Sequence, residues 1–302
     1  MAFRTKLLAL VLLAVPLAAG CSEGVIAVFL DDAGLSRPDG ASNRDSGSRA
    51  DSATWSDAAS GQDVQTVMDS AVGHDSAVTP DAATGSVVPP LGGSSGGSGG
   101  PTAPSGQQTT VNGVTFILIV PSSIRHPARC MIVYSGTETD DGMASNLKNV
   151  APMTNLQDVI FAVLDGPTYR GNGAAGATVL DWLRSQYDID NDRTFLLSES
   201  AGTTAGLQLG FHLRQSYFAA YWVNDVNASD TPQQTASQLG FAPWGNAGPG
   251  GDFADANSIV SAMRSAGYRL PNDAPYNGSG SGTHGSSDQF FAAMGFFDGK
   301  SR

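Results

Sequence analysis

The sequence Thr-Phe-Leu-Leu-Ser-Glu-Ser-Ala-Gly at residues 194–202 decides the fold of this chain. Its first four residues are mostly apolar, as in a buried strand, and the residues around Ser200 are small. The segment that follows, 203–215, combines apolar residues with glycine and alanine, which let a helix pack closely on a sheet. The stretch therefore predicts a strand, a sharp turn and a helix, with the Ser200 hydroxyl held above the end of a sheet.

The turn around Ser200 has the composition of a nucleophile elbow. Backbone strain and close helix packing require small residues two positions before and two positions after the serine. Ser198 and Gly202 occupy these positions, so the motif reads S-x-S-x-G, whereas glycine is usual at both. We interpret Ser200 as a nucleophile and its two small neighbours as the residues that permit the turn. The alternative is a helix that begins with small residues and carries no chemistry.

The first 20 residues have the pattern of a signal peptide: a basic start, a short apolar run at 7–17 and small residues at the exit. Cys21 follows directly, and this arrangement resembles a bacterial lipoprotein signal, in which that thiol is acylated. The other cysteine, Cys130, is far away, so no disulfide scheme requires Cys21. We expect lipid anchoring in the cell envelope, with Ser22 favouring the outer membrane. The alternative is an ordinary secretory peptide and a secreted protein.

Residues 21–110 have the composition of a disordered linker, rich in Gly, Ser, Ala, Asp and Pro. Aspartates recur every six residues, at Asp39, Asp45, Asp51, Asp57, Asp63, Asp69, Asp75 and Asp81. A stacked β-helix would also need a recurring aliphatic residue, and a calcium loop would need ligands on alternate residues; both are missing here. The pattern predicts an acidic tether that ends in a flexible tract at 92–100.

Residues 111–302 are long enough for one domain with its own core. The net charge of −12 disfavours nucleic acid as a partner, because phosphates would be repelled. Apolar strands alternate with helical stretches, as in an α/β sheet. Besides the strand before Ser200, the sequence predicts strands at 114–120, 130–134, 159–164, 218–223 and 267–270, a strand-like stretch at 239–244, and helices at 174–186, 255–266 and 287–297.

This order of elements, with a Ser-Gly turn after the second strand and a late histidine, resembles the α/β-hydrolases. It is most similar to the secreted esterases grouped with polyhydroxyalkanoate depolymerases and feruloyl esterases, in which an acidic turn like 187–193 leads into the elbow strand. The resemblance covers most of residues 111–302. It implies a mostly parallel sheet flanked by helices, and a carboxylic ester as the substrate, either a small molecule or a polymer.

A serine hydrolase needs a base that takes the serine proton. The chain has four histidines. His74 lies in the linker, His126 precedes the central strands, and His212 lies about three helical turns beyond Ser200. His284 remains, in a loop rich in Gly and Ser before the last helix, where it could reach Ser200. We predict His284 as the base; the alternative is a solvated loop histidine.

The acid of the triad should lie between Ser200 and the histidine in chain order. Asp252 is the first choice, because it lies shortly before the helix expected at 255–266. Asp255 is instead expected to be the N-cap of that helix. Asp225, just after the strand at 218–223, is the main rival, since some hydrolases carry the acid one strand earlier. Asp230 is a weaker one. Each could also be an ordinary loop carboxylate.

The oxyanion of the reaction needs backbone N–H donors. The amide of Ala201, directly after the nucleophile, is one candidate. The second should come from the turn at 135–138, where the family commonly has His-Gly and this chain has Ser135 and Gly136. We expect Thr137 as the second donor, with Gly136 close behind.

These residues predict a serine esterase that forms an acyl-enzyme on Ser200. The departures at Ser198, at Ser135 and around Trp244 favour a rival, a catalytically silent hydrolase-fold protein that binds at the cell surface. A serine peptidase is a third possibility. We expect no metal and no organic cofactor, because no Cys/His cluster occurs, and we expect a monomer.

Overall fold

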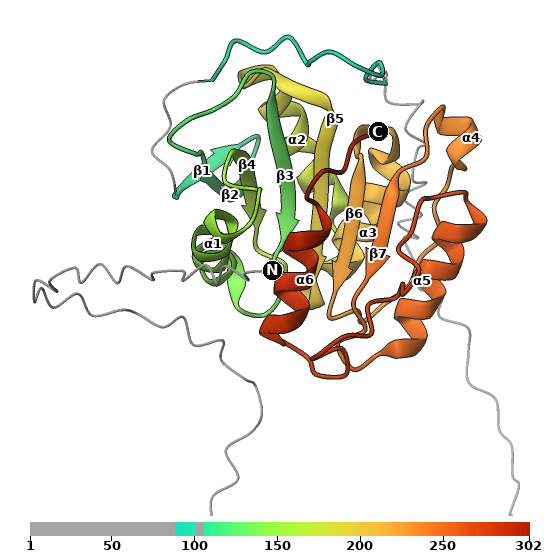
Figure 1. The fold of residues 1–302 in the computed structure, drawn as a ribbon. Coiled ribbons are helices and arrows are strands. Elements are labelled where there is room, and N and C mark those ends of the chain that lie inside the picture. Colours follow the sequence, from blue (N-terminus) through green and yellow to red (C-terminus); the bar gives the residue numbers. More distant parts are fainter. Residues whose placement is uncertain (1–87, 101–105) are drawn as a thin grey trace, which may run out of the picture.

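The computed structural model describes residues 88–100 and 106–302 of the chain (Figure 1). The expected signal peptide at 1–20, the lipidation site Cys21 and the tether up to residue 87 lie outside the described residues.

Seven strands form one sheet in the order β1-β2-β4-β3-β5-β6-β7. The strands are β1 (Gln107–Val111), β2 (Val114–Ile119), β3 (Ala128–Tyr134), β4 (Val159–Leu164), β5 (Ile189–Glu199), β6 (Ala220–Asn224) and β7 (Trp244–Ala247). β1 and β2 form an antiparallel hairpin, and β2 is antiparallel to β4. The other pairs are parallel, so the carboxyl ends of β3, β5, β6 and β7 lie at one edge of the sheet. The predicted mostly parallel sheet is confirmed.

Helices cover both faces of this sheet (Figure 1). They are α1 (Thr139–Val150), α2 (Gly173–Gln186), α3 (Thr203–Gln208), α4 (Ala236–Leu239), α5 (Phe253–Ser265) and α6 (Ser287–Phe296). Short helical turns lie at Ala151–Met153, Ser200–Gly202, Leu209–Leu213 and Gln215–Tyr217. Side chains of α1 and α6 share one buried core, and those of α2, α3 and α5 share the other. The sheet is therefore the middle layer of three.

Strand β5 is buried on both faces, as its apolar sequence requires. Leu196 packs into the core beneath α2 and α3, while Phe195 and Leu197 pack into the core beneath α1 and α6. β5 pairs with β3 on one side and β6 on the other. This central position makes the end of β5 a rigid place for a functional side chain.

Several elements differ from the sequence-based expectation. The polar residues 189–193 belong to β5 instead of a turn, and the stretch 267–270 forms only an isolated bridge between Trp244 and Arg269. The stretch 239–244 is not a strand along its length; the strand in this region is β7, which begins at Trp244. α5 starts two residues earlier than expected, and its N-cap is Asp252, so the assignment of Asp255 as the cap was wrong.

The expected flexible tract at 92–100 contacts the domain. Ser95 donates its N–H to the carbonyl of Ile189 at 2.8 Å, and Asn191 donates its N–H to the carbonyl of Gly93 at 3.2 Å. The carbonyls of Pro89 and Pro90 accept hydrogen bonds from the guanidinium of Arg302 at 3.1 and 2.6 Å. Residues 88–100 therefore form a strap along the start of β5, and the folded part of the chain begins before the expected boundary at 110.

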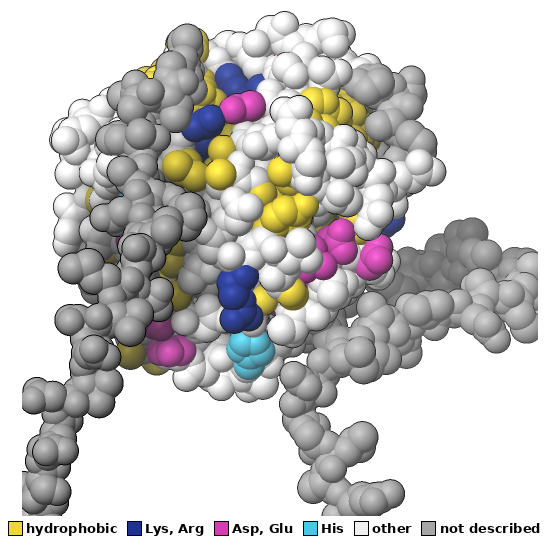
Figure 2. All heavy atoms as spheres, turned by 180° about the vertical axis from the view of Figure 1, so that it is seen from behind, with side chains coloured by type: hydrophobic (Ala, Val, Ile, Leu, Met, Phe, Trp, Pro, Cys, Tyr) yellow, Lys and Arg dark blue, Asp and Glu magenta, His cyan; other side chains and the backbone are white. Residues whose placement is uncertain are grey.

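Figure 2 shows the face behind the view of Figure 1, where basic, acidic and apolar side chains are interspersed among the described residues. Within 88–100 and 106–302, every helix is too short or too polar to cross a membrane.

Candidate active site

The turn after β5 places Ser200 at the carboxyl edge of the sheet. β5 ends at Glu199, one 3₁₀ turn spans Ser200–Gly202, and α3 starts at Thr203. Ser200 has a φ of 46°, in the left-handed region that costs a non-glycine residue about 1–3 kcal/mol. The packed strand and helix on either side hold this strained backbone, which is the geometry of a nucleophile elbow.

Small residues allow helix α3 to approach the sheet at this turn. A Cβ on Gly202 would lie 2.6 Å from the Cβ of Tyr134, and a Cβ on Gly206 would overlap the side chain of Ser198. Ser198 is itself only 1% exposed. The elbow therefore tolerates serine at 198 because glycine occupies the facing position 206 on α3.

The structure brings Ser200 and His284 together. The hydroxyl oxygen of Ser200 lies 3.0 Å from Nε2 of His284, which is within hydrogen-bond distance. His284 comes from the loop before α6, so the contact joins residues 84 positions apart in the chain. Ser200 is 7% exposed, whereas His284 lies at an exposed position of its loop, so the pair is reached from the solvent through the histidine side.

The second ring nitrogen of His284 faces a backbone carbonyl. Nδ1 lies 3.2 Å from the carbonyl oxygen of Gly250. A proton on Nδ1 that is donated to this carbonyl leaves the lone pair of Nε2 directed at the Ser200 hydroxyl. The backbone of Gly250 thereby favours the tautomer in which His284 can accept a proton from Ser200.

Of the two acid candidates, Asp225 lies beside the histidine loop and Asp252 caps a helix. Asp252 accepts a hydrogen bond from the N–H of Asp255 at 3.1 Å. Asp225 is fully buried just after β6, and its Oδ2 accepts a hydrogen bond at 2.6 Å from the N–H of Gly285, the residue after His284. The carboxylate that the sequence ranked second is thus the one held against the loop that carries His284.

A glutamine side chain fixes Asp225 in place. Gln289 of α6 donates its amide to Oδ1 of Asp225 at 3.1 Å and accepts the N–H of Asp225 at 3.1 Å. Burial raises the pKa of Asp225, while the N–H of Gly285, the charge of His284 and the Gln289 amide lower it. These contacts oppose the effect of burial and favour the carboxylate when His284 becomes positively charged.

The third acid candidate belongs to a separate pair. Asp230 lies 2.8 Å from Nε2 of His212, which is on the helical turn after α3. The contact with His212 helps to lower the pKa of Asp230. His212 and Asp230 are hydrogen-bonded to each other, and neither is hydrogen-bonded to Ser200.

The turn after β3 lies against Ser200, as the expected source of an oxyanion donor should. A Cβ on Gly136 would lie 3.3 Å from the Cβ of Ser200. The N–H of Gly136 is engaged by Glu138, whose Oε1 accepts it at 2.8 Å. Thr137 is exposed, and Ala201 is buried in the turn directly after Ser200.

Two glutamates next to Ser200 were not among the residues singled out from the sequence. Glu138 follows the predicted donors, and Glu199 directly precedes Ser200. Burial raises the pKa of Glu199 well above its ordinary value, and the carboxylates of Glu138 and Asp225 raise it further. Asn224 partly offsets this by donating its amide to Oε2 of Glu199 at 3.1 Å. Burial and the neighbouring carboxylates thus favour the neutral form of Glu199 relative to an ordinary glutamic acid.

One asparagine also supports the elbow. Asn227 donates its side-chain amide to the carbonyl of Ser200 at 2.9 Å.

Among the described residues, no group of three or more His, Cys, Asp or Glu side chains is arranged to hold a metal ion.

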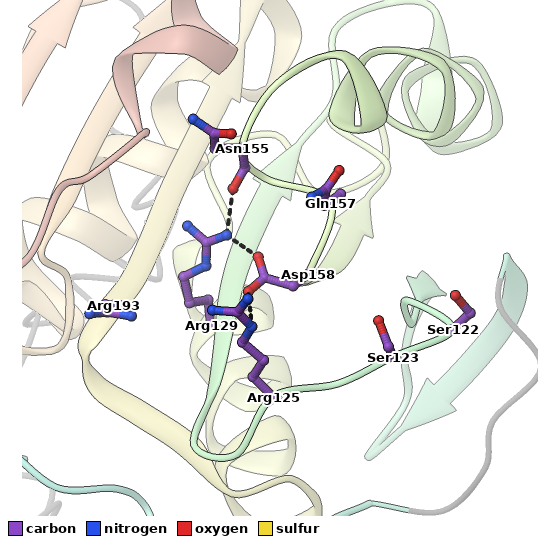
Figure 3. Close-up of a pocket in the computed structure, with 8 residues that line it drawn as sticks. All are labelled: Ser122, Ser123, Arg125, Arg129, Asn155, Gln157, Asp158 and Arg193. Atoms are coloured by element: carbon purple, nitrogen blue, oxygen red, sulfur yellow. Dashed lines mark hydrogen bonds and ion pairs between the residues drawn. The ribbon is translucent and has the colours of Figure 1, made fainter.

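A cavity of about 540 Å³ lies at the other edge of the sheet (Figure 3). It is lined by Ser122, Ser123, Arg125, Arg129, Asn155, Gln157, Asp158 and Arg193. Arg129, near the start of β3, contacts Asp158 and the carbonyl of Asn155, as Figure 3 shows. The cavity is therefore distinct from the Ser200 region at the carboxyl edge.

The strand order, with an antiparallel start, parallel remainder and a strained serine turn after β5, decides the architecture. The chain has the α/β-hydrolase fold. No protein-family model matches the sequence, and no curated protein does.

Solved structures resemble the chain at low identity. A thermostable esterase is 14% identical with a TM-score of 0.49; the match covers 65% of this chain and 62% of the esterase. A poly(3-hydroxybutyrate) depolymerase from Bordetella parapertussis is 16% identical with a TM-score of 0.46, over 65% of this chain and 90% of the depolymerase. A ferulic acid esterase from Anaeromyces mucronatus is 11% identical with a TM-score of 0.42, over 61% and 83%. These similarities concern the fold alone.

Proposed function

We propose that this protein is a serine hydrolase that cleaves carboxylic esters through an acyl-enzyme on Ser200. The observation that supports it most is the 3.0 Å contact between the Ser200 hydroxyl and Nε2 of His284 on a strained turn at the sheet edge. A nucleophile that lies within hydrogen-bond distance of its base is the arrangement that acyl transfer requires.

The reaction follows from this geometry. Nε2 of His284 accepts the proton of the Ser200 hydroxyl as the serine oxygen forms a bond to the ester carbonyl carbon. The resulting oxyanion is stabilised by backbone N–H groups, for which Ala201 and the Gly136–Thr137 turn are the candidates. The protonated imidazole then gives its proton to the alcohol, which leaves. Water, deprotonated by His284, attacks the acyl group and releases the carboxylic acid and free Ser200.

We assign the acid of the triad to Asp225 in preference to Asp252. Asp225 is buried beside the His284 loop, and the charge of His284 lowers the pKa of Asp225, so the carboxylate is close enough to stabilise an imidazolium through its charge. The direct partner of His284 Nδ1 is the carbonyl of Gly250. Gly250 itself has a φ of 50° and packs against Asp225. In this arrangement the carbonyl orients the ring and the carboxylate supplies the charge.

A fluorophosphonate probe tests the proposed function directly. The probe forms a phosphorus–oxygen bond with an activated serine and releases fluoride, so mass spectrometry should find it on Ser200 and nowhere on a Ser200→Ala variant. The variant should also lose hydrolysis of a short p-nitrophenyl ester while its circular dichroism stays unchanged. A folded wild-type protein that neither reacts with the probe nor hydrolyses esters would instead fit the catalytically silent, surface-binding alternative.

We also propose that Cys21 carries a lipid anchor in the cell envelope. The support is the position of Cys21 directly after an apolar signal segment with a small-residue exit. The full chain expressed in a bacterium should fractionate with membranes, and a Cys21→Ser variant should move to the soluble fraction. Equal membrane association of both would argue against lipidation.

A further inference from the structure

The carboxylate of Glu138 occupies a backbone donor next to the nucleophile. The N–H of Gly136 donates to Oε1 of Glu138 at 2.8 Å, within the turn that follows β3. A Cβ on Gly136 would overlap Oε2 of Glu138 and would lie 3.3 Å from the Cβ of Ser200. The carboxylate, the Gly136 backbone and the Ser200 side chain therefore meet at one place.

This position conflicts with acyl transfer. Negative charge develops on the ester oxygen beside the nucleophile, and backbone N–H groups of this turn are the candidate donors that stabilise it. An ionised carboxylate is itself an anion, so it takes the donor that the oxyanion needs. Its charge also repels a second anion in a partly buried site, where screening by water is weak. Loss of one such donor typically slows acyl transfer by about a hundredfold or more.

The charged groups around Glu138 come from three other elements. Glu199 lies at the end of β5, Asp225 lies after β6, and His284 lies in the loop before α6. Burial raises the pKa of Glu138 and Asp225 raises it further, whereas the Gly136 N–H and His284 lower it. On its own helix α1, the next acidic residues are Asp140 and Asp141 in the first turn. Neutral Glu138 therefore persists to a higher pH than an ordinary glutamic acid.

We propose that ionised Glu138 is an internal inhibitor of acyl transfer at Ser200, and that loss of its charge or release of the Gly136 amide each raises the rate. The inference rests on the proposed esterase function. Ionisation of Glu138 places a negative charge where the oxyanion would form, so it should lower the rate as the pH rises.

The test compares full-length wild-type protein with Glu138→Gln, Glu138→Ala and Asp141→Asn. Glutamine keeps the shape of the side chain without its charge, and alanine also frees the Gly136 amide. Asp141→Asn removes one exposed charge from the same helical turn and serves as the matched control. For each protein we would measure kcat/KM for p-nitrophenyl butyrate between about pH 5 and pH 8, and the rate of fluorophosphonate labelling of Ser200.

Both Glu138 variants should raise kcat/KM and the labelling rate near pH 8 by about tenfold or more and should lose the decline at high pH. Asp141→Asn should stay within about twofold of wild type. Rates at or below wild type in both folded Glu138 variants, with Ser200-dependent hydrolysis present, would overturn the inference and leave the esterase assignment intact. A complete lack of hydrolysis and labelling in every folded protein would overturn both. Adding Ser200→Ala to Glu138→Gln should abolish any gain.

Discussion

The carboxylate of Asp225 accepts a hydrogen bond at 2.6 Å from the N–H of Gly285, the residue that follows His284. This contact ties the end of β6 to the loop that carries the imidazole. Because Asp225 also bonds Gln289 of α6 through both its side chain and its N–H, the loop is held from two directions. The position of the His284 loop thus depends on a buried carboxylate, while the ring nitrogens of His284 contact Ser200 and Gly250 instead.

The two acid candidates should separate on mutation. Asp225→Asn removes the charge that stabilises the imidazolium, so kcat/KM for a p-nitrophenyl ester should fall by about a hundredfold or more. Asp252→Ala removes the N-cap of α5 and should lower the free energy of unfolding by about 1 kcal/mol with near-normal kcat/KM. Esterase assays and urea denaturation of both variants provide the measurements. The reverse pattern would restore Asp252 as the acid.

Glu199 should make the folded state less stable as the pH rises. Burial holds its folded-state pKa well above the ordinary value of 4.5, so the unfolded chain ionises first. The stabilisation is full below the unfolded pKa and is lost as the pH rises through the folded pKa. Glu199→Gln stays neutral, so it should be more stable than wild type at neutral pH, with the difference shrinking near pH 4.5.

Urea denaturation of both proteins across this range measures the difference. A gap that widens toward acid would show that Glu199 is ionised in the folded protein.

Because α3 packs closely on the turn at Ser200, replacing a glycine by alanine should change stability in opposite directions in α3 and in α6. A Cβ on Gly206 would overlap Ser198, so Gly206→Ala should destabilise the domain by about 1–3 kcal/mol and displace the turn that carries Ser200. Gly295, in α6, has nothing within 4 Å of its Cβ position. Gly295→Ala should raise stability by about 0.5–1 kcal/mol through the better helix propensity of alanine. Thermal unfolding compares the two, and equal effects would contradict the packing described here.

Arg302 should hold the strap 88–100 on the domain. Its side chain is 1% exposed and contacts Asp192 as well as the carbonyls of Pro89 and Pro90. Arg302→Ala leaves these acceptors without their donor, so it should cost about 1–3 kcal/mol of stability and open the strap to proteolysis. Arg170→Ala, at an exposed position, is the control and should change neither.

Limited proteolysis with mass spectrometry would locate the cuts. Protection of the strap that survives Arg302→Ala would mean that its backbone bonds to β5 suffice.

Much of the fold could be predicted because its strands are apolar and its elbow is short and specific. Two elements were missed although their signals were present. Asn112 and Gly113, both with positive φ, form the turn between β1 and β2, and Asn-Gly is a common hairpin signal. In α1, Met143, Leu147 and Val150 are buried at helical spacing, but glycine, serine and asparagine weaken the local helix propensity.

Other features depend on contacts that no local pattern contains. Residues 190–192 are polar, and they belong to β5 because the strap and Arg302 satisfy their hydrogen-bonding groups. The choice between Asp225 and Asp252 required the three-dimensional position of Gly285. Glu138 and Gly136 are neighbours in the sequence, so their contact is local. The sequence does not show that Ser200, which follows the distant strand β5, lies next to this contact.

The strap also attaches to the domain far from the candidate active site. It meets β5 near Ile189, whereas Ser200 follows the opposite end of the same strand, so about ten residues of extended chain, or roughly 30 Å, separate the point of attachment from the reacting hydroxyl. The C-terminal arginine is fastened at that same remote edge (Figure 1). The strap and the last residue of the sequence are thus both attached at the edge of the sheet opposite Ser200, which leaves the carboxyl edge free of both.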